Sequence, residues 1–440
     1  MTRLIASPTK SLSGTLRVPG DKSISHRALM FASLAIGESR IKGLLESEDV
    51  HATAGALRAC GSVITRDGAD WLVRGVGVGG YLEPETVLDM GNSGTSTRLL
   101  LGLLASQNIT AFFSGDASLS RRPMQRVITP LARCGAVFTS RMGGRLPLGI
   151  RGAEQPIPIE YTLPVASAQV KSAILLAGLN INGTTRVVEK YLSRDHTERM
   201  LAAIGADISI LSDSHGTRVI EINGGRELSP LSLTVPADPS SAAFPMVAAI
   251  ITKDSELVLP DVCLNPTRTG LITTLREMGA DIKISDESTL GGEPVGTLTV
   301  RNSRLKAVRV PSDRAASMID EYPILAIAAA SAVGGDTVCE GVAELRVKES
   351  DRLAAIARGL EACGVGVTMG EDTLTIHGTG RIKGGHTVAA ELDHRIAMSF
   401  LVAGLAADAP IAIDDAATIN SSFPGFEGLM RGVGAALANA

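Results

Sequence analysis

The 440-residue sequence contains few aromatic residues: one Trp, four Tyr and eight Phe. Proteins that bind single-stranded nucleic acid stack the bases on aromatic side chains, so this class is disfavoured. No charge sign dominates, because 42 Lys and Arg stand against 46 Asp and Glu, a formal net charge of −4. This balance provides no general attraction to nucleic acid or to an anionic membrane.

Long apolar runs and paired metal-ligand motifs are also missing. No stretch approaches the roughly 20 apolar residues that span a bilayer, and we expect no targeting signal, because the N-terminus lacks an apolar segment. The five cysteines form no CxxC pair, which favours a reducing cytoplasm and thiols used as small buried side chains. The seven His residues include no HExxH motif and no zinc spacing, so we expect neither a metal nor a cofactor.

What the sequence does contain is a repeat. Six amphipathic segments each end at a Gly that precedes a short alternating run, and Gly suits the left-handed residue that ends a helix. Before each of these lies a nearly all-apolar segment opened by Ser or Asp, and a helix that is apolar all round belongs inside a core. The glycines are Gly61, Gly135, Gly205, Gly279, Gly364 and Gly434, and the openings are Ser23, Ser93, Ser167, Ser240, Asp320 and Asp393.

The repeats predict an α/β fold of two lobes, each built from three units of two helices and a few strands. Val18-Pro19-Gly20-Asp21 recurs as Val235-Pro236-Ala237-Asp238, each time at the end of an extended run and before an apolar segment. Pro fixes φ at both places, which suits a defined crossing between lobes. We therefore expect one lobe to contain residues 1–20 and 238–440, and the other to contain residues 21–237.

Several apolar helices begin beside residues that a core does not need. Helix N-termini attract anions through free N–H groups and a partial positive charge. Capping explains each Ser or Asn alone, but not the neighbouring cations. The residues at the first three starts are Lys22, Ser23 and Arg27, then Gly94 and Arg98, then Ser167, Ala168 and Gln169.

Other cations lie in separate phrases, with Arg122 in RRPM and Arg194 in SRDHTER. We interpret LRVKESDRLAAIARGL as an amphipathic helix with Lys348, Glu349 and Arg352 in its first turns, where residues three apart share a face. The alternative is a solvated charged face with internal ion pairs. Asp320 either caps its helix or acts as a base. The residues alone thus predict a binder of, or an enzyme acting on, small phosphorylated metabolites.

Nine phrases in order resemble the EPSP synthase (3-phosphoshikimate 1-carboxyvinyltransferase) family from about residue 14 to about residue 434. They are PGDKSISHRA, GNSGTSTR, RRPM, ASAQVKSA, SRDHTER, DEYPILA, LRVKESDR, DHRIAMSF and SSFPGFE. The resemblance implies a two-lobed inverse α/β barrel of six repeats. It also implies transfer of the enolpyruvyl group of phosphoenolpyruvate to the 5-hydroxyl of shikimate 3-phosphate, with release of phosphate.

The resemblance also implies site residues. Asp320 resembles the base, Glu349 the acid that protonates the methylene carbon, and Lys22 a residue that stabilises the departing phosphate. Lys348 and Arg352 beside Glu349 should favour its ionised form. The implied shikimate 3-phosphate contacts are Lys22, Ser23, Arg27, Ser167, Ala168, Gln169, Arg194, Asp320 and Lys348. The implied phosphoenolpyruvate contacts are Lys22, Gly94, Arg122, Gln169, Arg352 and Arg395.

Two features resemble the second class of the family, which includes glyphosate-tolerant members. Ser421-Ser422 precedes Phe-Pro where the other class has Lys-Thr, and Ala168 stands where that class has Ser. Some tolerant members have Ala at the position of Gly94, and Gly here leaves room for the inhibitor. We expect small-molecule partners only, without nucleic acid or membrane, and a monomer.

Two rival functions stay open at this point. UDP-N-acetylglucosamine enolpyruvyl transferase shares the fold, but typically has Lys-Asn at Lys22-Ser23 and a catalytic Cys in a loop, whereas Cys60 and Cys134 are expected at helix ends. A non-catalytic anion-binding scaffold should lack an acid or a base, and both Glu349 and Asp320 are present.

Overall fold

The computed structural model describes residues 3–214 and 216–439. The chain divides into two compact units. The first unit contains Met1–Asp21, Pro236–Thr289 and Pro294–Ala440, and the second contains Lys22–Val235 and Leu290–Glu293. Three four-stranded sheets lie in each unit, which confirms the predicted mixed α/β fold of six repeats.

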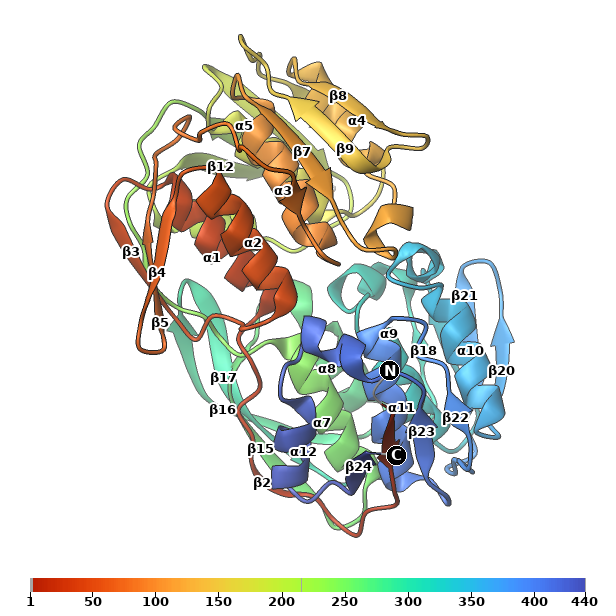
Figure 1. Ribbon diagram of the computed structural model, residues 1–440. Helices are drawn as coiled ribbons and strands as arrows, with labels where there is room; N and C mark the ends of the chain where they lie inside the picture. The colour runs from red at the N-terminus through yellow and green to blue at the C-terminus, as the bar shows by residue number, and fades with distance from the viewer. Residues whose placement is uncertain (1–2, 215, 440) are drawn as a thin grey trace. The chain divides into compact units, whose positions relative to one another are not determined.

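The second unit consists of three similar repeats (Figure 1). The first has α1 (Lys22–Leu34), β3 (Glu38–Lys42), α2 (Glu48–Ala59), β4 (Val63–Asp67) and β5 (Asp70–Arg74). The next has β6 (Leu88–Asp89), α3 (Gly94–Ala105), β7 (Thr110–Ser114), η1 (Leu119–Arg121), α4 (Gln125–Arg133), β8 (Val137–Arg141) and β9 (Arg145–Arg151). The last has β10 (Glu160–Thr162), α5 (Ala168–Gly178), β11 (Thr184–Glu189), α6 (His196–Ala203), β12 (Asp207–Ser212), β13 (Arg218–Asn223) and then β14 (Ser232–Thr234).

The first unit repeats this plan. It begins with β1 (Leu4–Ala6) and β2 (Ser13–Thr15), then continues with α7 (Pro239–Ile251), β15 (Glu256–Cys263), η2 (Pro266–Arg268), α8 (Gly270–Glu277), β16 (Asp281–Leu290) and β17 (Glu293–Arg301). Next come β18 (Arg309–Val310), η3 (Ser312–Ser317), α9 (Tyr322–Ala330), β19 (Asp336–Glu340), η4 (Ala343–Val347), α10 (Arg352–Ala362), β20 (Gly366–Met369) and β21 (Thr373–His377). The last repeat has β22 (Thr387–Val388), α11 (His394–Ala406), β23 (Ile411–Ile413), η5 (Ala417–Ser421), α12 (Phe426–Gly432) and β24 (Leu437–Asn439).

Each sheet has one parallel and two antiparallel strand pairs. In the sheet of β6, β7, β9 and β8, for example, β6 runs parallel to β7, and β9 is antiparallel to both β7 and β8. A parallel pair needs a crossover, and α3 provides it. Two edge strands are exchanged between the repeats of the two units. Strand β2 precedes α1 but pairs with β15, and β14 precedes α7 but pairs with β3. The chain passes between the units next to these two strands.

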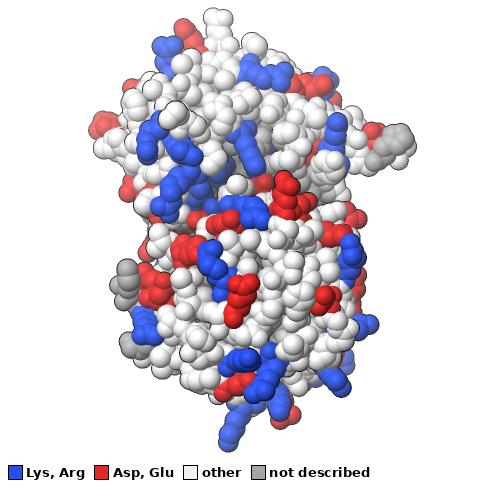
Figure 2. Space-filling view, turned by 90° about the vertical axis from the view of Figure 1, so that its right-hand side faces the viewer, with Lys and Arg blue, Asp and Glu red and all other residues white. Residues whose placement is uncertain are grey.

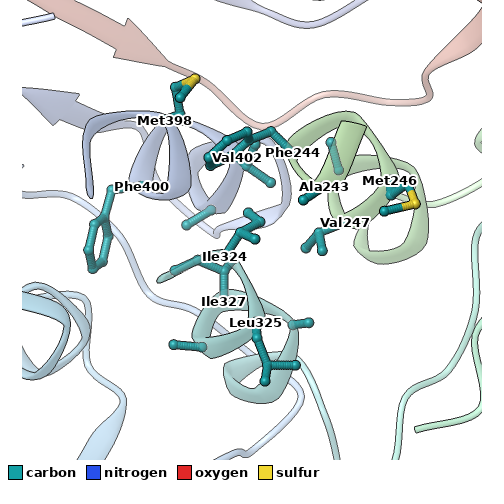
Figure 3. Packing of buried hydrophobic residues seen from close by; sticks show 14 of the residues in the cluster. Ala243, Phe244, Met246, Val247, Ile324, Leu325, Ile327, Met398, Phe400 and Val402 are labelled. Carbon is teal, nitrogen blue, oxygen red and sulfur yellow. The ribbon is translucent and has the colours of Figure 1, made fainter. Parts of the chain in front are cut away.

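The nearly all-apolar helices form the cores. In the first unit α7, α9 and α11 pack against one another, and Val247, Ile324 and Val402 point into the space between them in Figure 3. In the second unit α1, α3 and α5 contribute to the separate core cluster. The prediction of six buried helices is therefore confirmed.

The glycines that end the amphipathic helices have the predicted conformation. Their φ angles lie between 79° and 110°, in the left-handed region that disfavours a Cβ atom: Gly61, Gly135, Gly205, Gly279, Gly364 and Gly434. The cysteines that precede three of them (Cys60, Cys134 and Cys363) are free and buried, as predicted. Burial raises the pKa of Cys60 to about 11, so this thiol stays protonated at neutral pH.

Several helix starts differ from the predictions. Helix α7 is capped by Asp238 and not by Ser240, and α9 has Glu321 at its N-cap and not Asp320. The helix predicted over residues 345–360 is interrupted, because η4 ends at Val347 and α10 begins at Arg352, where the cap residue Asp351 accepts a hydrogen bond from the Ala354 N–H. The unit boundary also differs, because Leu290–Glu293 groups with the second unit, where Glu293 Oε1 lies 2.7 Å from His196 Nδ1.

Charges of both signs are scattered over the face drawn in Figure 2, with uncharged surface between them. No helix among the described residues is long and apolar enough to cross a membrane.

Gly102 marks a close helix crossing in the second unit. A Cβ atom there would lie 2.4 Å from the carbonyl oxygen of Ala173, so α3 and α5 would have to separate. We expect Gly102→Ala to lower the free energy of unfolding by about 1–3 kcal/mol. The matched change is Gly55→Ala in α2, where no atom lies within 4 Å; it should raise stability by about 0.5–1 kcal/mol. Urea unfolding tests both, and two changes of the same sign would contradict this packing.

Candidate active site

In the second unit, most of the predicted site residues lie at helix N-terminal ends, whereas Arg122 follows η1. Lys22 and Ser23 begin α1, Gly94 begins α3, and Ser167 caps α5, whose first residues are Ala168 and Gln169. Arg194 lies in the segment just before α6. Free N–H groups at these starts favour an anionic ligand.

Side chains connect the starts of α3 and α5. Arg98 Nη1 donates to Gln169 Oε1 at 2.8 Å, and Gln169 Nε2 donates to Thr95 Oγ1 at 2.9 Å. A Cβ atom on Gly94 would lie 2.9 Å from Arg98 Nη1 and 3.2 Å from Arg122 Nη1. Both guanidinium groups therefore lie beside the backbone where α3 begins.

Arg27 connects α1 to α5 and α6. Its Nε donates to Thr197 Oγ1 at 2.7 Å, and its Nη2 donates to Ser172 Oγ at 2.8 Å. Its Nη1 also donates to the Ser23 carbonyl at 3.0 Å. All of these partners lie in the first two turns of α1, α5 or α6. Arg27 is therefore held near the helix starts that carry the other predicted site residues.

Lys22 forms an ion pair with the buried carboxylate of Asp49 in α2. Behind this pair, His26 Nδ1 lies 2.7 Å from Thr53 Oγ1, which lies 2.6 Å from Ser96 Oγ. This chain of polar side chains ties α1, α2 and α3 together. The helix starts that carry Lys22, Arg27 and Gly94 are thus held as one group.

The segment that carries Arg194 is anchored by a buried ion cluster. Lys171 Nζ lies 3.1 Å from Glu189 Oε1 and 2.7 Å from Glu198 Oε1, with at most 1% of these side chains exposed. Glu189 Oε1 also accepts the Ser193 N–H at 2.9 Å. This cluster was not predicted from the sequence, although a Lys inside an apolar helix indicates a buried partner.

In the first unit, the predicted residues gather around Arg352, which is fully buried. Its Nη2 lies 2.6 Å from Glu349 Oε2, its Nη1 3.2 Å from Asp320 Oδ1 and its Nε 2.7 Å from Asp393 Oδ2. The alternative of a solvated charged face is wrong for Arg352, which is buried, whereas the internal ion pairs that it also predicted are present between Arg352 and Glu349 and between Arg346 and Asp351. Glu349 and Arg352 contact each other as predicted, but they do not share a helix, because α10 begins at Arg352.

Arg395 and Lys348 complete this group. Arg395, in the first turn of α11, donates from Nη1 to the Asp320 carbonyl at 3.2 Å. Lys348 directly precedes Glu349. Three cations thus accompany three carboxylates in the first unit. In the second unit the predicted cations are Lys22, Arg27, Arg122 and Arg194, and Lys22 pairs with Asp49.

The local charges set the ionisation of the first-unit group. Burial opposes the charge of Arg352, but Asp393, Glu349 and Asp320 raise its pKa. Burial also opposes ionisation of Asp393, but Arg352 lowers its pKa. Burial lowers the pKa of Lys348, against the effect of Asp320. Because the side chains of Asp320 and Glu349 are 17% and 21% exposed, a ligand can reach both carboxylates.

Among the described residues, no three His, Cys, Asp or Glu side chains cluster in a way that could hold a metal ion.

A second buried cluster in the first unit provides a pH-dependent prediction. Arg268 contacts Asp21 and Asp238 at 2.8 and 3.1 Å. Burial and the Asp21 charge raise the pKa of Asp238 from 3.8 to about 6. A raised pKa means that the folded protein binds the proton more tightly than the unfolded chain, so ionisation costs stability as the pH rises from about 4 to 6.

We therefore expect Asp238→Asn to change the pH dependence of stability. Asn keeps the N-cap acceptor for the Ser240 N–H but does not titrate in this range. The free energy of unfolding of the unmodified protein should rise relative to the variant between pH 7 and pH 4, by about 1–3 kcal/mol. Urea unfolding at a series of pH values measures this difference. Parallel profiles would show that Asp238 does not titrate as described.

Three comparisons with known proteins agree. A family model described as EPSP synthase (3-phosphoshikimate 1-carboxyvinyltransferase) matches residues 6–430. The 3-phosphoshikimate 1-carboxyvinyltransferase of Parvibaculum lavamentivorans is 59% identical over 98% of this chain and 96% of its own, and that of Paramagnetospirillum magneticum is 57% identical over 99% of both. A crystal structure of EPSP synthase from Acinetobacter baumannii matches over the full length of both chains with a TM-score of 0.88 and 44% identity. The enolpyruvyl transferase NikO from Streptomyces tendae, 19% identical with a TM-score of 0.77 over 100% of this chain and 99% of its own, shares the fold.

Proposed function

Because this chain belongs to the EPSP synthase family, we propose that its two residue groups act on one pair of substrates. The chain transfers the enolpyruvyl group of phosphoenolpyruvate to the 5-hydroxyl of shikimate 3-phosphate and releases phosphate. The observation that carries the division of roles is the placement of the groups: the second-unit residues lie mostly at helix starts, which favour anions, and the first-unit group has two partly exposed carboxylates beside buried Arg352.

We assign anion binding mainly to the second unit. Together the substrates carry about five to six negative charges, since each phosphate contributes about −1.5 to −2. Shikimate 3-phosphate binds Lys22, Ser23, Arg27, Ser167, Ala168, Gln169 and Arg194, with Asp320 and Lys348 from the first unit. Phosphoenolpyruvate binds Lys22, Gly94, Arg122 and Gln169, with Arg352 and Arg395 from the first unit. Arg is suited to this task because its planar fork matches phosphate and carboxylate groups.

Asp320 and Glu349 carry the two proton transfers. Asp320 takes the proton of the 5-hydroxyl as its oxygen forms a bond to C2 of phosphoenolpyruvate, and Glu349 delivers a proton to C3. The resulting tetrahedral intermediate has a methyl group. The Glu349 carboxylate, ionised by the first transfer, then takes a proton from this methyl group as the bond from C2 to phosphate breaks, which forms the enol ether, while Lys22 stabilises the charge on the phosphate.

The sister reaction with UDP-N-acetylglucosamine is the second candidate. It typically uses a catalytic Cys in a loop, whereas all five cysteines of this chain are buried. Incubation with phosphoenolpyruvate and either acceptor, followed by mass spectrometry, tests the function. We expect a carboxyvinyl product from shikimate 3-phosphate alone. Product from UDP-N-acetylglucosamine would overturn the assignment, and no product from either would support the non-catalytic scaffold.

We further assign this chain to the second class of the family, on Ala168 and Ser421-Ser422. Gly94 has no side chain beside Arg98 and Arg122, which supports inhibition by glyphosate in competition with phosphoenolpyruvate. The same reaction run across a glyphosate series tests this point, and activity that is unaffected at millimolar glyphosate would contradict it. The free cysteines support a cytoplasmic location, and we expect the chain to act as a monomer.

A further inference from the structure

Two hydroxyl groups of the second unit contact the Arg27 guanidinium from different elements. Ser172 lies in α5 and Thr197 in the first turn of α6, yet Ser172 Oγ and Thr197 Oγ1 are 2.7 Å apart. Both residues and Arg27 are at most 3% exposed. Three polar side chains from distant parts of the chain therefore meet in a buried place. We explain this contact by its effect on the Arg27 guanidinium.

The direction of each hydrogen bond follows from counting hydrogens. Ser172 Oγ donates its hydrogen to the Ala168 carbonyl at 2.6 Å, so it can only accept from Thr197 Oγ1 and from Arg27 Nη2. Thr197 Oγ1 therefore donates to Ser172 and accepts from Arg27 Nε. Each hydroxyl has one donor role and at least one acceptor role. All of these hydrogen bonds can form together only when the hydroxyl oxygens of Ser172 and Thr197 both face the Arg27 guanidinium.

This geometry fixes the plane of the guanidinium group. Nε and Nη2 both point at hydroxyl oxygens, at 2.7 and 2.8 Å, while Nη1 is held by the Ser23 carbonyl. Hydroxyl and carbonyl oxygens orient a guanidinium without adding a negative charge beside it. These three contacts hold the Arg27 guanidinium in a defined direction, which favours pre-organised binding.

We propose that Ser172 and Thr197 are positioning residues, which hold the Arg27 guanidinium in the orientation that binds shikimate 3-phosphate. The proposal rests on the proposed function, in which Arg27 contacts this substrate. Thr197 lies three residues after Arg194, at the start of α6. Through Thr197 this helix start also fixes the position of Arg27 relative to Arg194, and both cations are assigned to substrate binding. Neither hydroxyl touches the reacting atoms.

Thr197→Val tests the proposal, because it removes the hydroxyl and nearly keeps the shape. Hydrogen bonds to charged groups contribute about 1.5–3 kcal/mol, so we expect KM for shikimate 3-phosphate to rise about 10- to 100-fold. The kcat should change less than threefold, since the lost interaction serves binding. Thr197→Ser, which restores the oxygen, should return KM to within about threefold of the starting value.

Thr185→Val is the matched control. Thr185 lies in β11 of the same unit, is 1% exposed, and its hydroxyl makes no hydrogen bond with any residue that the structure describes. It should leave KM unchanged. Equal KM increases in both Val variants, or no increase in Thr197→Val, would overturn the positioning role.

Ser172→Ala provides a second, independent test that also applies if Thr197→Val does not fold. It should raise KM in the same way, and the double variant should raise it by less than the product of the two effects, since both hydroxyls act through Arg27. Multiplicative effects would contradict the shared mechanism. If the unmodified protein forms no product from shikimate 3-phosphate and phosphoenolpyruvate, the proposed function has failed; if it does and these variants match it, only the positioning role has failed.

Discussion

Replacing Glu349 by Gln is expected to lower kcat about 100- to 10,000-fold, the range for losing a general acid. Gln has nearly the same shape but has no proton to transfer to carbon. Arg352 keeps its contacts with Asp320 and Asp393, so the surrounding group should stay in place. Shikimate 3-phosphate binding, measured by titration calorimetry, should change less than threefold, while phosphate release reports kcat.

The control for this change is Glu361→Gln. Glu361 lies near the end of α10 and is exposed, so both kcat and KM should stay within twofold of the starting values. If Glu349→Gln retained more than a third of the activity, Glu349 would not be the acid.

Lys171→Met is expected to destabilise the second unit strongly. It leaves Glu189 and Glu198 buried without the cation that both contact. Breaking a buried ion cluster by removing one partner costs about 3–5 kcal/mol. Because Glu189 also anchors Ser193, the segment before Arg194 should loosen, and KM for shikimate 3-phosphate should rise in the variant molecules that fold.

Urea unfolding at pH 7 measures the change in stability. Lys190→Met, on an exposed Lys in the same segment, should change the free energy of unfolding by less than about 0.5 kcal/mol. Adding Glu198→Gln to Lys171→Met should recover part of the loss, because one of the two buried negative charges is removed. A loss below about 1 kcal/mol in Lys171→Met would contradict the description of this cluster.

The fold could be predicted from the sequence because its signals are local. A helix that is apolar on every face and a Gly in the left-handed conformation at a helix end are each decided within one repeat, as at Gly61 and Gly364. Six copies in order made the pattern unambiguous. The mixed fold of six repeats follows from such signals.

Helix starts were predicted less well. Asp320 and Asp351 are both typical N-cap residues, and periodicity alone predicted a helix that begins at Leu345, whereas α10 begins at Arg352. Asp351 forms the cap and Asp320 does not, because Asp320 instead accepts from Arg352. The role of the Asp320 carboxylate thus depends on a contact with a residue 32 positions away in the chain, and a local sequence pattern cannot predict such a contact.

The partners that hold the site were missed for the same reason. Thr197 contacts Arg27 from 170 residues away, and Asp49 pairs with Lys22 from a neighbouring helix. Thr and Asp are both common in local sequences of this kind, so neither residue stands out. Only Lys171 gave a local signal, because a charge in an apolar helix needs a buried partner. Motifs therefore predicted the substrate-binding residues, and the tertiary structure was needed to find the residues that contact them.

The most direct test of the account is to run the reaction in D2O and analyse the vinyl methylene of the product by mass spectrometry. The Glu349 side chain is 21% exposed, so its carboxyl proton exchanges with solvent between turnovers. Delivery of deuterium to C3 makes a CH2D group. Loss of hydrogen from this group leaves deuterium in the product, and loss of deuterium does not, so most of the product should carry deuterium. The account predicts that most of the product is one mass unit heavier at this carbon, with shikimate 3-phosphate required. Product formed entirely without deuterium would contradict addition followed by elimination and the role of Glu349.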